Sequence, residues 1–129
     1  MGNDPLERAL ALLGPLESRI MRAVWTRTAA QEFVVRDMLA LMPELAYTTV
    51  MTTLRRLAEK GLLTAHAEVG TKAYVYRSAG SPEDYLTMAS RRDAAEAVDK
   101  YGDAALAAFA ARLDELTEGQ RERLGKLLK

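Results

Sequence analysis

The clearest periodic pattern in the chain lies between residues 46 and 60. Apolar side chains recur there at helical spacing and form one stripe: Tyr47, Val50, Leu54, Leu57, Ala58 and Gly61. With a step of about 100° per residue, Thr52 falls about 200° from Val50, on the opposite side. The pattern predicts an amphipathic helix with one core-facing side, which Gly61 ends directly after Lys60.

The residues after this helix alternate in the manner of strands. From Leu63 to Val69 apolar and polar side chains alternate, which predicts a strand with one buried face. Gly70 provides a turn with positive φ, and a return strand follows over 73–77 with Tyr74 and Tyr76 on one face. The segment therefore predicts a β-hairpin that carries Lys72 at its tip.

The upstream residues supply two more helices and a short strand. Gly14 and Pro15 open a helix that keeps an apolar stripe as far as Trp25. Phe33 and Val34 fit a small strand, and a second helix runs from about 35 to 42, where Pro43 stops it. Helix, short strand, helix, helix and hairpin is the order of a winged helix-turn-helix domain, so the fold class is mainly α with a small antiparallel β wing.

The polar side of the 46–60 helix has the chemistry of a DNA-reading surface. It carries short hydroxyls and forked cations with hardly any bulky apolar group: Thr48, Thr49, Thr52, Arg55, Arg56 and Glu59. Threonine contacts phosphates, base edges and thymine methyls, whereas arginine binds guanine or phosphate. Lys72 at the hairpin tip can reach a phosphate or the minor groove. The alternative is a solvated helix face and a solubilising turn lysine.

Three further helices are predicted after residue 80, over 82–101, 104–116 and 118–128. Ser81 caps the first ahead of Pro82, Asp103 caps the second, and Thr117 opens the third with a capping box. Their thin apolar stripes bury little alone, so we expect them to interleave with a second copy of the chain. The expected dimerisation residues are Leu86, Val98, Leu106, Phe109, Leu113, Leu124 and Leu127. The alternative is a helical hairpin packed on its own domain.

Several segments together resemble one known family. The segments LGPLESRIMRAVW, VRDMLALM and AYTTVMTTLRRLAEKGLL, followed by a hairpin ending AYVYR and a helical tail, are similar to the penicillinase repressors of the BlaI/MecI type. The likeness extends from about Leu13 to the end, and AYTTVMTTLRRLAEKGLL is its most specific part.

This resemblance implies a dimeric transcriptional repressor. Thr48, Thr49, Thr52 and Arg55 would enter the major groove, and Arg36 and the wing near Lys72 would contact the DNA backbone. The operators would be palindromes with TACA/TGTA-like half-sites. In the family a sensor and protease pathway cleaves an Asn-Phe pair in the second tail helix, but this sequence has Ala108-Phe109 there, which puts cleavage in doubt.

Composition limits the cofactors and compartments. The chain has no cysteine, and His66 is its single histidine, so we expect no metal and no cofactor, and the copper-responsive branch of the family is excluded. No stretch reaches the roughly 18 consecutive apolar residues of a membrane span, and the start lacks a secretory signal. These features predict a cytoplasmic protein.

Net charge is zero, so the distribution of charge matters. Residues 45–78 hold 5 basic and 2 acidic side chains, and residues 79–129 hold 8 basic and 10 acidic ones. The small basic excess coincides with the expected reading surface, which implies few phosphate contacts per subunit. At 129 residues we expect an N-terminal extension over 1–12, a winged helix-turn-helix domain over 13–78 and a dimerisation region over 79–129.

Other functional classes have less support. One histidine, no cysteine and no glycine-rich phosphate loop argue against an enzyme. A winged helix used for protein contact is the main alternative, and it would present aromatic or methionine anchors on the outer helix face. A winged-helix repressor of another family that responds to a small ligand is the third candidate.

Overall fold

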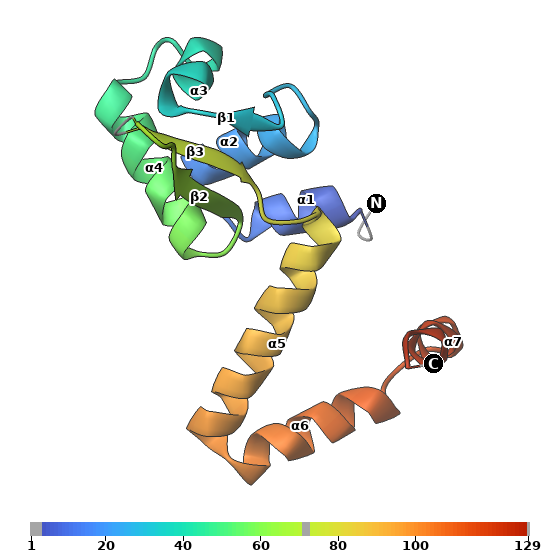
Figure 1. Cartoon of the computed structure of the whole chain (residues 1–129). Helices are drawn as coiled ribbons and strands as arrows, with labels where there is room; N and C mark the ends of the chain where they lie inside the picture. Colours follow the sequence, from blue (N-terminus) through green and yellow to red (C-terminus); the bar gives the residue numbers. More distant parts are fainter. Residues whose placement is uncertain (1–3, 71–72, 129) are drawn as a thin grey trace. The chain divides into compact units, whose positions relative to one another are not determined.

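A computed structural model describes residues 4–70 and 73–128. Figure 1 shows the elements in chain order: α1 (Pro5–Ala11), α2 (Pro15–Trp25), β1 (Glu32–Phe33), α3 (Val35–Leu41), α4 (Tyr47–Glu59), β2 (Leu63–Ala67), β3 (Tyr74–Ser78), α5 (Pro82–Tyr101), α6 (Asp103–Asp114) and α7 (Glu118–Leu127). The chain divides into two compact units, Met1–Met88 and Ala89–Lys129. This order confirms the predicted fold class, a winged helix-turn-helix with a helical C-terminal region.

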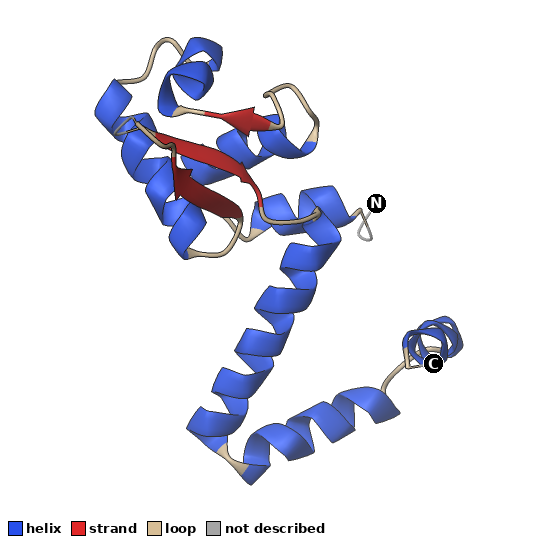
Figure 2. Cartoon of the chain, in the orientation of Figure 1, coloured by secondary structure: helices blue, strands red, loops and turns tan. Residues whose placement is uncertain are grey.

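The wing is a three-stranded antiparallel sheet in the order β1-β3-β2 (Figure 2). Tyr76 of β3 pairs with Phe33 of β1 on one side and with Ala65 of β2 on the other. The rings of Phe33 and Tyr76 stack with centroids 6.1 Å apart. The short first strand therefore fixes the hairpin to the body of the domain through one aromatic pair.

The first hairpin strand is less buried than its alternation predicts. β2 ends at Ala67, only Leu63 in it is buried, and Val69 is 99% exposed. The expectation of a half-buried strand reaching Val69 is therefore wrong. The alternation of apolar and polar residues shows which side chains share a face of β2. Beyond Leu63, however, the apolar face of β2 is not covered by the core. Along β3 the same limit appears, because Tyr76 pairs with Phe33 of β1 and is buried, whereas Tyr74 pairs with Ala67 of β2 but lies beyond the positions that β1 covers and is 55% exposed.

The core of the first unit lies between α2, α3, α4 and the sheet. Its largest fully buried side chains are Ile20, Met21, Phe33, Met38, Val50, Leu54, Leu57, Leu62 and Leu63. The predicted inward stripe of α4 is thus confirmed at Val50, Leu54 and Leu57. Tyr47 departs from it and is 45% exposed, because it is the first residue of α4 and lies ahead of the first buried turn.

The segment before α2 contains a helix that sequence reasoning missed. Asp4 caps α1 by accepting a hydrogen bond from the Leu6 N–H at 3.0 Å, and Pro5 occupies its first turn. Ala9 and Leu10 are buried, and α1 packs on α2. Asp followed by Pro is a helix-start signal, so the sequence did contain the evidence for α1.

The helices of the second unit begin at glycine or at a capping side chain. Gly102, with φ of +61°, takes the N-cap position of α6, so the expectation that Asp103 caps this helix is wrong by one residue. The left-handed φ of Gly102 explains the shift, since glycine adopts it without steric cost. The capping box at Thr117 and Gln120 is confirmed, with backbone-to-side-chain distances of 2.9 and 3.2 Å.

Candidate nucleic-acid interface

The outer face of α4 is open to solvent at the residues predicted to read DNA. Thr48, Thr49, Arg55 and Arg56 are exposed, and Thr52 is half-buried. Ala46, the N-cap of α4, contributes no side-chain hydrogen bond, so the first-turn N–H groups have no side-chain cap. A helix start of this kind favours an anion such as a phosphate.

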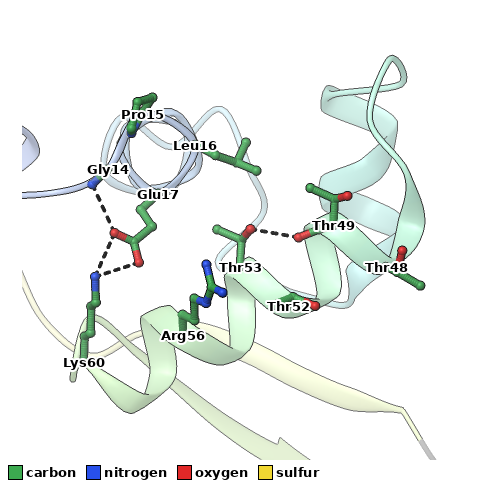
Figure 3. A pocket seen from close by; sticks show the side chains of 10 residues that line it. All are labelled: Gly14, Pro15, Leu16, Glu17, Thr48, Thr49, Thr52, Thr53, Arg56 and Lys60. Carbon is green, nitrogen blue, oxygen red and sulfur yellow. Dashed lines mark hydrogen bonds and ion pairs between the residues drawn. The ribbon is translucent and has the colours of Figure 1, made fainter.

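Hollows flank α4 on two sides, and each contains one of its arginines. On the side of α2 lies an open hollow of about 750 Å³, into which Arg56 projects (Figure 3). Its lining comes from the start of α2 and the polar side of α4: Gly14, Pro15, Leu16, Glu17, Thr48, Thr49, Thr52, Thr53, Arg56 and Lys60. Arg55 lies on the other side, facing the wing.

Two buried polar residues beside this surface escaped sequence reasoning. Thr53 is 6% exposed, and its hydroxyl donates to the Thr49 carbonyl oxygen at 2.8 Å. Glu17 is 8% exposed although it is charged. For Glu17 the one local signal is its place three residues after Gly14, because burial depends on which helix lies beside it.

Glu17 joins the start of α2 to the end of α4. Its Oε1 accepts from the Gly14 N–H at 3.1 Å and from the Lys60 ammonium at 2.9 Å, and its Oε2 lies 2.9 Å from the same ammonium. Burial alone would raise the pKa of Glu17. The hydrogen bonds from Lys60 and Gly14 and the positive charges of Lys60 and Arg56 outweigh burial, so the pKa lies below its usual value.

The wing side of α4 combines arginines with tyrosines. A hollow of about 230 Å³ brings Arg36 of α3 and Arg55 of α4 together with Tyr47, Tyr74 and Tyr76. Burial raises the pKa of the Tyr76 hydroxyl, against the opposing charge of Arg55. Arg36 and Arg55 thus share one edge of the surface, while Arg56 belongs to the other. The predicted wing-tip contact, Lys72, lies outside the described residues.

The predicted dimerisation residues carry exposed apolar surface in the tail. Leu106, Phe109, Leu113 and Leu127 are 53%, 42%, 49% and 80% exposed, respectively. The remaining members of the predicted set are half-buried: Leu86, Val98 and Leu124. Large apolar groups at helical spacing that remain open to water are typical of an interaction surface.

Over residues 4–70 and 73–128, the acidic and histidine side chains form no group of three that could hold a metal ion. In the same ranges no helix has both the length and the apolar character needed to cross a bilayer.

One solved structure shares the fold at low sequence identity. A structure of TrmBL2, described as an archaeal chromatin protein with a novel mode of DNA binding, aligns with a TM-score of 0.53 at 17% identity, over 88% of this chain and 43% of that one. A possible transcriptional regulator from Methanosarcina mazei Go1 aligns with a TM-score of 0.49 at 16% identity, over 77% of this chain and 87% of that one.

Sequence comparisons are more specific. The transcriptional regulator BlaI of Mycobacterium tuberculosis, in strains CDC 1551 / Oshkosh and ATCC 25618 / H37Rv, is 47% identical over 55 residues. The match covers 42% of this chain and 40% of the relative's length. A family model described as penicillinase repressor matches residues 13–129. The expected family and the expected absence of enzymatic activity are both confirmed, because this is a family of transcriptional regulators. The chain belongs to the penicillinase repressor family.

Proposed function

We propose that the protein is a homodimeric transcriptional repressor that binds a palindromic operator through α4 and the wing near residues 70–72. The exposed hydroxyl and guanidinium groups of α4 are the observation that carries this proposal. They stand between two hollows, with Thr48 and Thr52 near the middle and Arg55 and Arg56 at the two margins. Threonines then contact bases, and arginines bind guanine or phosphate.

Contacts with the DNA backbone would come from both edges of this surface. On the wing side, Arg36 and Arg55 lie close enough to line one hollow, and phosphate is the natural anion for such a pair. Lys72 would add a contact at the wing tip. Family likeness suggests TACA/TGTA-like half-sites for the operator.

The tail would hold two copies together. Its exposed leucines and Phe109 would be covered by the partner, and the two α4 helices would then enter the major groove about one DNA turn, ~34 Å, apart. Both half-sites contribute to one binding event, which compensates for the small basic excess of each subunit. Residues 13–78 would read DNA, residues 79–129 would dimerise, and residues 1–12 would be an extension. A regulatory protease would be a further partner if it accepted the Ala108-Phe109 pair, where the family's cleavage pair has asparagine before phenylalanine.

Two measurements test the proposal. Fluorescence anisotropy with a duplex that carries a TACA/TGTA palindrome should show tight binding, and a scrambled duplex of the same composition should bind far more weakly. Sedimentation velocity should show a dimer. A monomer, or equal affinity for both duplexes across a salt series, would contradict the proposal. Mapping of DNA bound in the cell would then identify the operator.

One observation favours the alternative of a protein-binding winged helix. Tyr47 and Tyr74 are 45% and 55% exposed beside Arg55, and tyrosine with arginine is the composition of a protein interface core. The same groups also suit a sugar-phosphate backbone. Substituting both tyrosines with phenylalanine separates the two functions, because loss of the hydroxyls weakens phosphate contacts but leaves most of an apolar protein contact in place.

A further inference from the structure

We propose that Glu17 limits the affinity of the protein for duplexes of any sequence, by keeping the Lys60 ammonium away from phosphate. This inference rests on the proposed DNA-binding function. It assigns a role in DNA affinity to an acidic side chain, whereas the candidate DNA contacts are hydroxyls and cations.

Glu17 lines the hollow between α2 and α4 that would face DNA. Its side chain is only 11% exposed, and it lies at the end of the hollow where α2 begins and α4 ends (Figure 3). A carboxylate beside a phosphate-binding surface opposes DNA binding, because it repels the backbone. Its presence there therefore requires a compensating role.

Glu17 binds Lys60 with both of its carboxylate oxygens. Both carboxylate oxygens lie 2.9 Å from the Lys60 ammonium, and one of them also accepts the Gly14 N–H at 3.1 Å. Lys60 is 48% exposed, so it would be free to reach a phosphate if Glu17 did not hold it. The ion pair thus removes one cation from the electrostatic attraction to any duplex.

One cation more or less matters in a DNA-binding region with so few of them. Residues 45–78 contain 5 basic and 2 acidic side chains. Non-specific binding depends almost entirely on phosphate contacts, whereas specific binding also uses base contacts. Withholding one ammonium per subunit therefore weakens binding to palindromic and other duplexes alike and leaves the base-reading groups of α4 in place, so the ratio of the two affinities stays nearly the same.

Glu17→Gln tests the inference on the full-length protein. Glutamine keeps the size of the side chain and an oxygen for the Gly14 N–H, but it releases Lys60. Affinity for a scrambled duplex of about 30 base pairs should rise, and the plot of log affinity against log salt should steepen by about one unit per subunit. Affinity for a TACA/TGTA palindrome should rise by a similar factor, so the ratio of the two affinities should stay nearly unchanged.

The double variant Glu17→Gln/Lys60→Gln should restore the parental salt slope, because the released cation is gone. Glu44→Gln serves as the matched control, since it breaks the Arg19–Glu44 pair at 2.8 Å, which also involves α2 but does not line the hollow. That control should leave the slope unchanged. A purely structural role for Glu17 would lower both affinities without changing the slope, and that result would overturn the inference.

A second variant keeps the test valid if Glu17→Gln does not fold. Lys60→Gln alone should lower the affinity for every duplex, because it leaves the Glu17 carboxylate unpaired, but it should reduce the salt slope by less than one unit per subunit, since Lys60 makes no phosphate contact in the parent. A slope reduced by about one unit per subunit would overturn the inference. If the parent binds no duplex at low salt, the proposed function itself fails, and this inference fails with it. Binding by the parent with an unchanged slope in the Glu17 variant refutes the inference alone.

Discussion

Trp25 donates a hydrogen bond from its indole Nε1 to the carbonyl oxygen of Gly80, 3.0 Å away and 55 residues further along the chain. The same oxygen accepts a hydrogen bond from the Ser78 hydroxyl. The centroids of the Trp25 and Tyr85 rings lie 6.5 Å apart. The end of α2, the end of β3 and the start of α5 are therefore joined at one point. This junction connects the winged helix-turn-helix domain to α5, the helix that leads into the C-terminal region.

Trp25→Phe should lower the free energy of unfolding by about 1 kcal/mol, since the ring contact is retained and one hydrogen bond is lost. Urea denaturation followed by circular dichroism measures the change. Trp25→Ala serves for comparison and should lower the free energy of unfolding by about 3–5 kcal/mol, because it also removes the ring. Equal losses in the two variants would show that the hydrogen bond and not the ring stabilises the junction.

Arg55→Ala should weaken binding to the palindromic duplex by about 1–3 kcal/mol while the thermal melting curve stays unchanged, because Arg55 is exposed and contributes no core contact. Arg91→Ala is the control, since Arg91 is an exposed helical arginine in α5. An Arg55 variant that binds as tightly as the parent would remove Arg55 from the DNA interface.

Phe109→Glu should convert the proposed dimer to monomer at micromolar concentration, because it places a charge in a surface that the partner would desolvate. Sedimentation velocity measures the change, and affinity for the two-half-site duplex should fall with it. Leu12→Glu provides the comparison, since Leu12 is 59% exposed but lies far from the tail in sequence. Dissociation by both variants alike would argue against a tail-specific interface.

Leu10→Ala should cost about 2–5 kcal/mol of stability, because Leu10 is 3% exposed where α1 packs on α2. Leu12→Ala, two residues later and largely exposed, should change stability by less than about 0.5 kcal/mol. Chemical denaturation of both variants decides whether residues 5–11 belong to the folded domain. Equal stability of the two variants would mean that α1 contributes nothing to it.

Stability should depend on pH through Glu17. Its pKa in the folded protein lies below the ordinary value of 4.5, so the folded state prefers the charged carboxylate. Glu17 therefore stabilises the fold above pH 4.5, and this contribution is lost as the pH falls through the folded pKa. The difference in unfolding free energy between the parent and Glu17→Gln should shrink over that acidic range. A constant difference from neutral to acidic pH would contradict the assigned ion pair.

Local signals predicted most of the fold. The inward stripe of α4 follows from helical spacing, and the starts of α2, α5 and α7 follow from proline or capping residues at Pro15, Pro82 and Thr117. α1 was missed because seven residues are too few to show a periodic stripe, although Asp4 and Pro5 mark its start. Gly102 and Asp103 show the limit at boundaries, where one backbone dihedral angle decides which residue caps the helix.

The candidate site was only partly predictable for a different reason. The polar face of α4 is a property of one helix, so its residues can be identified from spacing alone. The pairing of Glu17 with Lys60 joins residues 43 positions apart, and it arises only when α2 and α4 pack together. Arg36 and Arg55 likewise come to line one hollow through the packing of α3 against α4 and the wing. Tertiary neighbours of this kind cannot be inferred from the pattern of a single element.

The placement of arginines at the margins of α4 and of threonines near its centre has a kinetic consequence. Cations attract a duplex over a distance of about 8–10 Å at physiological ionic strength, whereas a hydroxyl or a methyl acts only in contact. In the proposed complex, the arginines would therefore speed association with DNA, and the threonines would discriminate among sequences. Such a protein would associate rapidly with DNA of any sequence and dissociate rapidly from most of it. Its complex would be long-lived only where the bases match.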